Sequence, residues 1–129
     1  VFLWSASLIG LIFIINLALK NFWGRSRPGD VINFGGTDSF TPWYQITDQC
    51  ISNCSFVSGD SSVGFALIVF YFLVKKKIYL WIALTFGLCL GLIRIMEGGH
   101  FISDVVFSGI VIFIFYPLCY NFYIKKFNG

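Results

Sequence analysis

Four long apolar runs constrain this chain more than any other feature of its sequence. They cover about residues 1–19, 57–74, 78–96 and 101–123. Each is close to the roughly 20 apolar residues that a helix needs to cross the ~30 Å hydrocarbon core of a bilayer. Backbone polar groups must be paired inside lipid, so such runs are expected to be helical. The sequence therefore predicts an all-α integral membrane bundle with four transmembrane helices in one domain, residues 1–129.

Composition supports this class over a water-soluble one. Only 12% of the residues are charged and 57% are apolar, whereas soluble domains carry about 25% charged residues. The lysine clusters are short and adjoin apolar runs, so nucleic acid is a disfavoured partner. No basic segment precedes the first run and no small-residue cleavage site follows it. We therefore expect no secretory signal peptide, and we interpret the chain as a piece of a longer one.

The distribution of charge predicts an orientation. Four crossings place residues 20–60 and 94–104 on one face, and the C-terminus with the loop between the second and third runs on the other. Cytoplasmic segments are enriched in Lys and Arg, which assigns the second face to the cytoplasm, because it carries two purely basic clusters: Lys75, Lys76, Lys77, Lys125 and Lys126. The first face would then be periplasmic in a bacterial inner membrane. Four cations remain there: Lys20, Arg25, Arg27 and Arg94.

The one long polar stretch, about residues 21–56, is rich in Pro and Gly and is expected to be an irregular outer loop. Its rings Trp23, Trp43 and Tyr44 suit the headgroup layer, an interpretation that we favour over substrate contact. Cys50 and Cys54 lie in the same loop. A periplasmic location would permit a disulfide between them, but their spacing does not fix the geometry that a disulfide needs.

Three of the outer cations are candidates for binding an anion. Lys20 and Arg27 are seven residues apart, so they share a face if the first helix continues to Pro28, which would end it. Arg94 ends the third run on the same side. One cation at a helix end is often a snorkelling anchor, but three at the end of an apolar bundle are costly unless an anion neutralises them. Phosphate is the natural candidate.

Two further segments could act on such a phosphate. Ser58 and Gly59 enter the second helix and could offer backbone N–H groups to an anion, while Asp60 could be an ordinary cap. His100 is the only histidine, and Asp104 follows four residues later. A carboxylate at this spacing can hold the ring in one tautomer and leave the other nitrogen free to attack. A metal site is disfavoured because the neighbouring cations would repel a divalent ion.

Taken together, these residues resemble the three-part signature of the type 2 phosphatidic acid phosphatase family. The parts are Lys20-x6-Arg27-Pro28, Ser58-Gly59 and Arg94-x5-His100-x3-Asp104. The segments KNFWGRSRP, QCISNCSFVSGD and GGHFISDVVFSG are most similar to the branch of bacterial lipid A 4′-phosphatases. Membrane members of the family have six helices, so the resemblance equates this chain with helices three to six.

The resemblance also implies roles. His100 would form a phosphohistidine, Asp104 would orient it, and the phosphate would bind to Lys20, Arg27, Arg94 and the backbone at Ser58 and Gly59, without a metal or other cofactor. Three positions depart from the family pattern: Val57 replaces Pro, Ile93 replaces Ser, and Asp60 replaces the His that protonates the leaving oxygen. Asp60 could serve only if protonated; Glu97 or water are the alternative proton donors.

The implied reaction is hydrolysis of a lipid phosphate monoester, with lipid A as the expected substrate. Phosphatidic acid, phosphatidylglycerol phosphate and undecaprenyl diphosphate are alternatives that keep the mechanism. A non-catalytic protein that binds lipid phosphate is an alternative of another class, and the departure at Asp60 is its best support. The sequence does not specify an oligomeric state.

Overall fold

The computed structural model describes residues 2–127, apart from the side chains of residues 2–5, 7 and 8. This part of the chain is helical and contains no strand, only an isolated bridge between Val31 and Asp38. The α-helices are α1 (Phe2–Trp23), α2 (Gly59–Phe65), α3 (Val69–Val74), α4 (Ile78–Met96) and α5 (Ile102–Phe127); the 3₁₀ turns are η1 (Pro28–Asp30), η2 (Ile32–Phe34) and η3 (Ala66–Ile68).

The helices follow the apolar runs closely. The second run is one continuous helical segment, Gly59–Val74, in which η3 joins α2 to α3. The third run is α4, with the predicted bounds. Two ends were predicted wrongly: α1 continues to Trp23 rather than ending near residue 19, and α5 continues to Phe127. Pro117 lies inside α5 without ending it.

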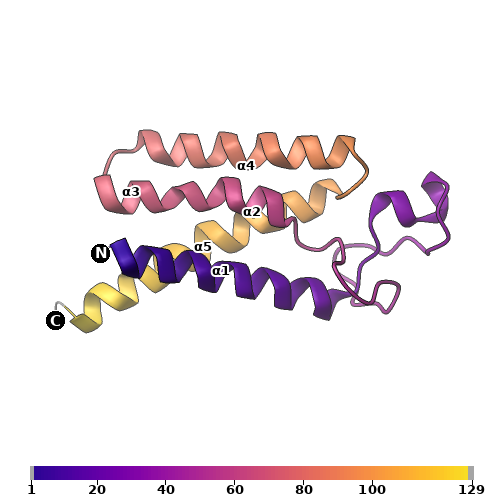
Figure 1. Ribbon diagram of the computed structural model, residues 1–129, viewed down its shortest axis with the longest axis horizontal. Coiled ribbons are helices and arrows are strands. Elements are labelled where there is room, and N and C mark those ends of the chain that lie inside the picture. The colour runs from indigo at the N-terminus through magenta and orange to yellow at the C-terminus, as the bar shows by residue number, and fades with distance from the viewer. Residues whose placement is uncertain (1, 128–129) are drawn as a thin grey trace.

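The helices bring the expected segments to opposite ends of the bundle (Figure 1). The N-terminal end of α1, the turn between α3 and α4 and the C-terminal end of α5 lie at one end. The loop that follows α1 and the junction between α4 and α5 lie at the other end. The lysine clusters are therefore separated from the predicted site by the length of the helices.

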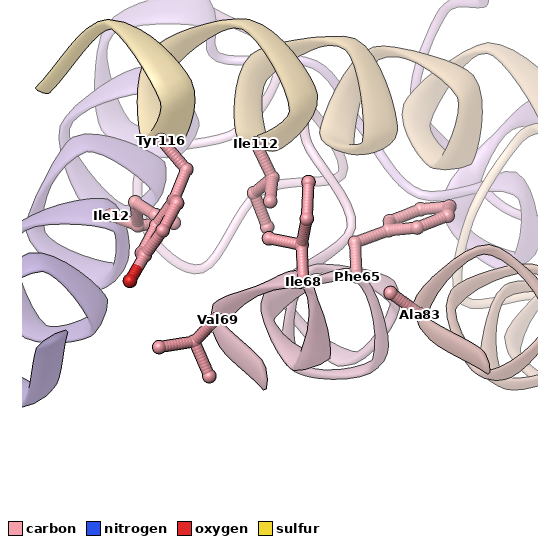
Figure 2. Packing of buried hydrophobic residues seen from close by; sticks show 7 residues of the cluster. All are labelled: Ile12, Phe65, Ile68, Val69, Ala83, Ile112 and Tyr116. Carbon is pink, nitrogen blue, oxygen red and sulfur yellow. The ribbon is translucent and has the colours of Figure 1, made fainter. Parts of the chain in front are cut away.

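Apolar side chains from all the long segments meet in the centre of the bundle (Figure 2). The buried cluster consists of Ile12, Phe65, Ile68, Val69, Ala83, Ile112 and Tyr116. Beside it α2 lies very close to α4, because a Cβ atom on Gly64 would come within 2.6 Å of the Gly87 backbone nitrogen. This contact fixes the C-terminal end of α2 against the helix that carries Arg94.

Two of the helices, α4 and α5, are long and apolar enough to cross a membrane. The segment Gly59–Val74 is apolar but shorter. Large apolar side chains on the outer faces of α4 and α5 are exposed, for example Trp81 at 66% and Leu118 at 61%. Helices in lipid expose such faces to acyl chains. Among the described residues these two helices are candidate spans by length and composition, and the expectation of four transmembrane helices remains a prediction.

Candidate active site

The end of α1 determines where Arg27 lies. The helix ends at Trp23, and Gly24 then adopts a left-handed conformation with φ +62°. A Cβ atom at this glycine would lie 1.9 Å from the Thr47 carbonyl oxygen, so only glycine fits the turn. Arg27 has extended backbone, with φ −73° and ψ 154°. The idea that Lys20 and Arg27 share a helix face is therefore wrong, because the chain leaves the helix between them.

The three predicted cations nevertheless converge at this end of the bundle. A Cβ atom on Gly59 would lie 3.5 Å from Lys20 Nζ. A Cβ atom on Gly99 would lie 3.6 Å from both Arg27 Nη1 and Arg94 Cζ. Lys20 also interacts electrostatically with both arginines. Two glycines thus leave the backbone beside His100 and at the start of α2 open to three positive side chains.

His100 lies two residues before the start of α5. The helix begins at Ile102, and the Asp104 carboxylate turns back to accept a hydrogen bond from the Phe101 N–H at 2.8 Å. This is one half of a capping box, in which the side chain at the third helical position accepts from the N-cap backbone N–H. His100 Nδ1 lies 3.7 Å from Asp104 Oδ2, and both residues are buried, at 1% and 0% exposure. The predicted pair is therefore together, although the distance exceeds that of a hydrogen bond.

Two residues that the sequence analysis did not identify as part of the site hold the same carboxylate. Arg25 Nη1 donates to Asp104 Oδ1 at 2.7 Å, and the Ser55 hydroxyl donates to Asp104 Oδ2. Both are buried. Burial lowers the pKa of the Arg25 guanidinium, and the neighbouring Asp104 carboxylate opposes this shift. The charge of Asp104 is thus matched by Arg25, whose only signal in the sequence was its place among the outer cations.

Arg94 is paired in a different way. Its Nε lies 2.9 Å from Asp60 Oδ2, and its Nη1 donates to Glu97 Oε2 at 2.7 Å. The arginine side chain is 35% exposed and each carboxylate is 55% exposed. Asp60 is therefore placed beside a predicted phosphate ligand, as an ion-pair partner in the arrangement described here.

The start of α2 departs in part from the prediction. Ser58 caps the helix through its side chain, which accepts from the Ser61 N–H at 3.4 Å. Its backbone N–H donates to the Asp104 carbonyl oxygen at 3.1 Å, so this donor is used within the protein. Gly59 is the first helical residue, where N–H groups lack partners within the helix. Of the two predicted backbone donors, Gly59 is the one that remains suited to an anion.

A disulfide joins Cys50 to Cys54. The short loop that it closes presents Asn53, whose backbone oxygen accepts from Arg27 Nε and Nη2 at 3.2 and 3.1 Å. The Asn53 side-chain oxygen accepts from Nη2 as well, at 3.1 Å. This loop therefore positions a predicted phosphate ligand, and no local sequence pattern indicated this role for Asn53.

A cavity of about 750 Å³ lies beside His100. Its wall is mostly apolar and aromatic, and comes from the loop after α1 and the junction of α4 and α5; it includes Phe34, Phe40, Pro42, Trp43, Tyr44, Met96, Phe101 and Ile102. Trp43 and Tyr44 thus line a space next to the histidine in addition to any contact with the headgroup layer. The candidate site thus places a cluster of three cations near an apolar cavity, whose wall also includes Arg25 and His100.

The model of the PAP2 superfamily matches residues 2–128. A lipid A 4′-phosphatase of Francisella tularensis subsp. novicida (strain U112) is 47% identical over 110 residues, which are 82% of this chain and 50% of that protein. Lipid A 4′-phosphatases of Rhizobium leguminosarum and Rhizobium etli are 36% and 34% identical over 112 and 115 residues, covering 82% and 84% of this chain and 48% and 45% of theirs. No solved structure matches.

The chain spans about half the length of the curated relatives that it matches. The family model, in contrast, covers nearly all of the chain and includes every part of the three-part motif. The resemblance inferred from the motifs is confirmed: the chain belongs to the PAP2 superfamily.

Proposed function

We propose that this chain carries the active site of a membrane-embedded phosphatase that hydrolyses a lipid phosphate monoester through a phosphohistidine. The observation that carries the proposal is the convergence of Lys20, Arg27 and Arg94 on the glycines beside His100 and at the start of α2. Three cations around one buried imidazole match a phosphate dianion and the charge that grows on its oxygens in the transition state.

In the proposed reaction, Asp104 holds the ring through Nδ1 and the opposite nitrogen, Nε2, attacks phosphorus. The bond from phosphorus to the leaving oxygen breaks, and that oxygen takes a proton from an acid or from water. Water then attacks the phosphohistidine, which releases inorganic phosphate and restores the imidazole. Asp60 and Glu97 both lie at Arg94, so either carboxyl group could deliver the first proton if protonated. No step needs a metal.

The apolar cavity and the names of the relatives support a lipid substrate, and we propose lipid A. The recess beside His100 suits the apolar part of the leaving alcohol, while the cations hold the phosphate. Phosphatidic acid, phosphatidylglycerol phosphate and undecaprenyl diphosphate are substrates that the same mechanism could use. Phosphate release from a panel of these four lipids in mixed micelles would rank them.

We also propose that the four helical segments cross a bacterial inner membrane, with the site at the periplasmic face. Both lysine clusters lie at the opposite end of the bundle (Figure 1), which agrees with the enrichment of Lys and Arg in cytoplasmic segments. A disulfide in the loop beside the site agrees with an oxidising compartment. Labelling of cysteines introduced at residue 37 and at residue 76 by a membrane-impermeant reagent would test this orientation.

A non-catalytic protein that binds lipid phosphate is a second candidate, favoured by one observation. Asp60 occupies the position at which the family has the histidine that protonates the leaving oxygen, and here it is ion-paired with Arg94. The two functions differ in turnover. We expect the full-length protein to release phosphate and His100→Ala to lose at least about 10⁴-fold in rate. A wild-type protein that binds lipid phosphate but never releases it would establish the non-catalytic function instead.

A further inference from the structure

We infer that Arg25 is a positioning residue, which acts on the reaction by holding the Asp104 carboxylate at His100. The inference rests on the proposed function and adds a residue to it that does not touch the phosphate. It follows from the Arg25 contacts, from their burial and from the way in which Asp104 divides its two oxygens.

Three hydrogen bonds and a contact with an aromatic ring hold the Arg25 side chain. Its Nε donates to the Thr41 carbonyl oxygen at 3.0 Å, and its Nη1 donates to Ser103 Oγ at 2.7 Å and to Asp104 Oδ1 at 2.7 Å. The guanidinium carbon lies 4.1 Å from the centre of the Phe101 ring. The residue is 3% exposed. A guanidinium held in this way has little freedom to follow a substrate.

The two oxygens of Asp104 have different partners. Oδ1 faces Arg25, whereas Oδ2 accepts from the Ser55 hydroxyl and the Phe101 N–H and lies 3.7 Å from His100 Nδ1. Arg25 therefore holds one oxygen and thereby fixes the plane of the carboxylate, with the other oxygen directed at the imidazole. Without the Arg25 contact the carboxylate is held through one oxygen alone, and its plane is less well defined.

Charge points the same way. A buried carboxylate without a partner is costly, and truncating one member of a buried ion pair leaves such a group behind. Arg25 supplies the matching charge within the protein. The Asp104 carboxylate is thus kept paired inside the bundle, where it can act on the imidazole.

A backbone hydrogen bond to Arg25 also positions Ser55 beside the Asp104 carboxylate. The Ser55 N–H donates to the Arg25 carbonyl oxygen at 2.8 Å, which sets the serine hydroxyl beside Asp104. Arg25 and Ser55 thus donate to the two oxygens of the same carboxylate, and removing either side chain should affect the reaction through Asp104.

The experiment is a double-mutant cycle in the full-length protein, purified in detergent, with whichever lipid of the four-member panel turns over fastest. The variants are Arg25→Gln, Arg25→Lys, Asp104→Asn and the double variant Arg25→Gln/Asp104→Asn. We expect Arg25→Gln to lower kcat by roughly 10²-fold, as a misplaced catalytic group does, with KM changed less than about threefold. Arg25→Lys keeps the charge without the planar fork and should recover about tenfold of the loss.

The double variant separates positioning from any independent role. If Arg25 acts through Asp104, its loss adds nothing once the carboxylate is gone, and the double variant matches Asp104→Asn within about threefold. The double variant also contains no lone buried charge, so it keeps the test decisive if Arg25→Gln alone fails to fold. Ser55→Ala offers a second route, with an expected loss of about tenfold in kcat that vanishes in the Asp104→Asn background.

Two results would overturn the inference while leaving the proposed function intact. The first is a double variant that falls a further 10²-fold or so below Asp104→Asn. The second is an Arg25→Gln variant that raises KM and keeps kcat, because that pattern belongs to a residue that binds substrate. A wild-type protein without turnover would instead remove the proposed function, and this inference with it.

Discussion

The two arginine–carboxylate pairs at this end of the bundle make opposite use of the same chemistry. Arg25 and Asp104 are 3% and 0% exposed and are surrounded by further hydrogen bonds. Arg94 is 35% exposed, and its partners Asp60 and Glu97 are each 55% exposed. A buried pair is kept whole because breaking it leaves an uncompensated charge, whereas an exposed pair exchanges partners at little cost. The buried Arg25–Asp104 pair is therefore suited to a fixed support, and the exposed Arg94 side chain is suited to binding phosphate.

The comparison also suggests how phosphate enters. Arg94 already holds two carboxylates, so a phosphate that approaches it replaces one anion with another. In the proposed reaction, the phosphate would take the place of Asp60 on Arg94 and leave this carboxyl group near the bound substrate. The pair would then link the binding of phosphate to the release of a carboxyl group that could carry a proton.

Within the exposed pair, the largest effect is expected at Asp60. Asp60→Asn keeps the size of the side chain but removes the acid, so kcat should fall by the roughly 10²- to 10⁴-fold of a lost general acid. Asp60→His introduces the residue that the family has at this position and should retain turnover within about tenfold of the wild type. Steady-state phosphate release measures both. Near-normal activity of Asp60→Asn would exclude Asp60 from proton transfer.

Removing Arg94 should separate the two pairs most clearly. Arg94→Gln loses one charged ligand of the transition state, so kcat/KM should fall by about 10²- to 10³-fold, and inhibition by orthovanadate should weaken. The free energy of unfolding should change by less than about 1 kcal/mol, since the pair is exposed. Asp104→Ala breaks the buried pair and should cost about 3–5 kcal/mol. Denaturation in detergent provides the stability comparison, and equal losses for the two variants would contradict the distinction.

The same contrast explains how much the sequence could predict. The helices were predictable because apolar runs of this length have few alternatives in lipid, and the His100, Asp104, Arg27 and Arg94 spacings marked the site. Arg25 could not be distinguished from other outer cations, because its role depends on burial under Phe101 and on a contact 79 residues away in the chain. Long-range contacts of this kind leave no local pattern.

The errors at α1 have a local cause. The spacing of Lys20 and Arg27 fitted two helical turns, but Gly24 ends the helix by adopting a positive φ against the Thr47 carbonyl oxygen. Lys20 lies in the last turn of α1. Arg27 still reaches the site, because the segment after Gly24 returns towards the junction of α4 and α5, where Gly29 N–H donates to the Gly98 carbonyl oxygen at 3.0 Å. The seven-residue spacing of Lys20 and Arg27 thus depends on the turn at Gly24, and helical periodicity does not explain it.

Removing the disulfide should have a smaller effect on the kinetics, which acts through Arg27. Cys50→Ser/Cys54→Ser should loosen Asn53 and with it Arg27, so KM should rise about three- to tenfold with kcat changed less than about twofold, as for a weakened binding contact. Cys89→Ser/Cys119→Ser is the matched control, since neither of these residues is in the disulfide. A loss confined to kcat would instead indicate that the loop acts on Asp104 through Ser55.

The smallest effect is expected at Glu97. This variant tests whether both carboxylates at Arg94 are needed for turnover. Glu97→Gln removes one carboxylate from Arg94 and leaves Asp60 in place 2.9 Å from Nε. Surface ion pairs are worth about 0–1 kcal/mol, so kcat and KM should each change less than about threefold. If Glu97 were the proton donor, the same substitution would lower kcat by about 10²-fold or more. Measured beside Asp60→Asn, this variant therefore decides which of the two carboxylates at Arg94 takes part in the reaction.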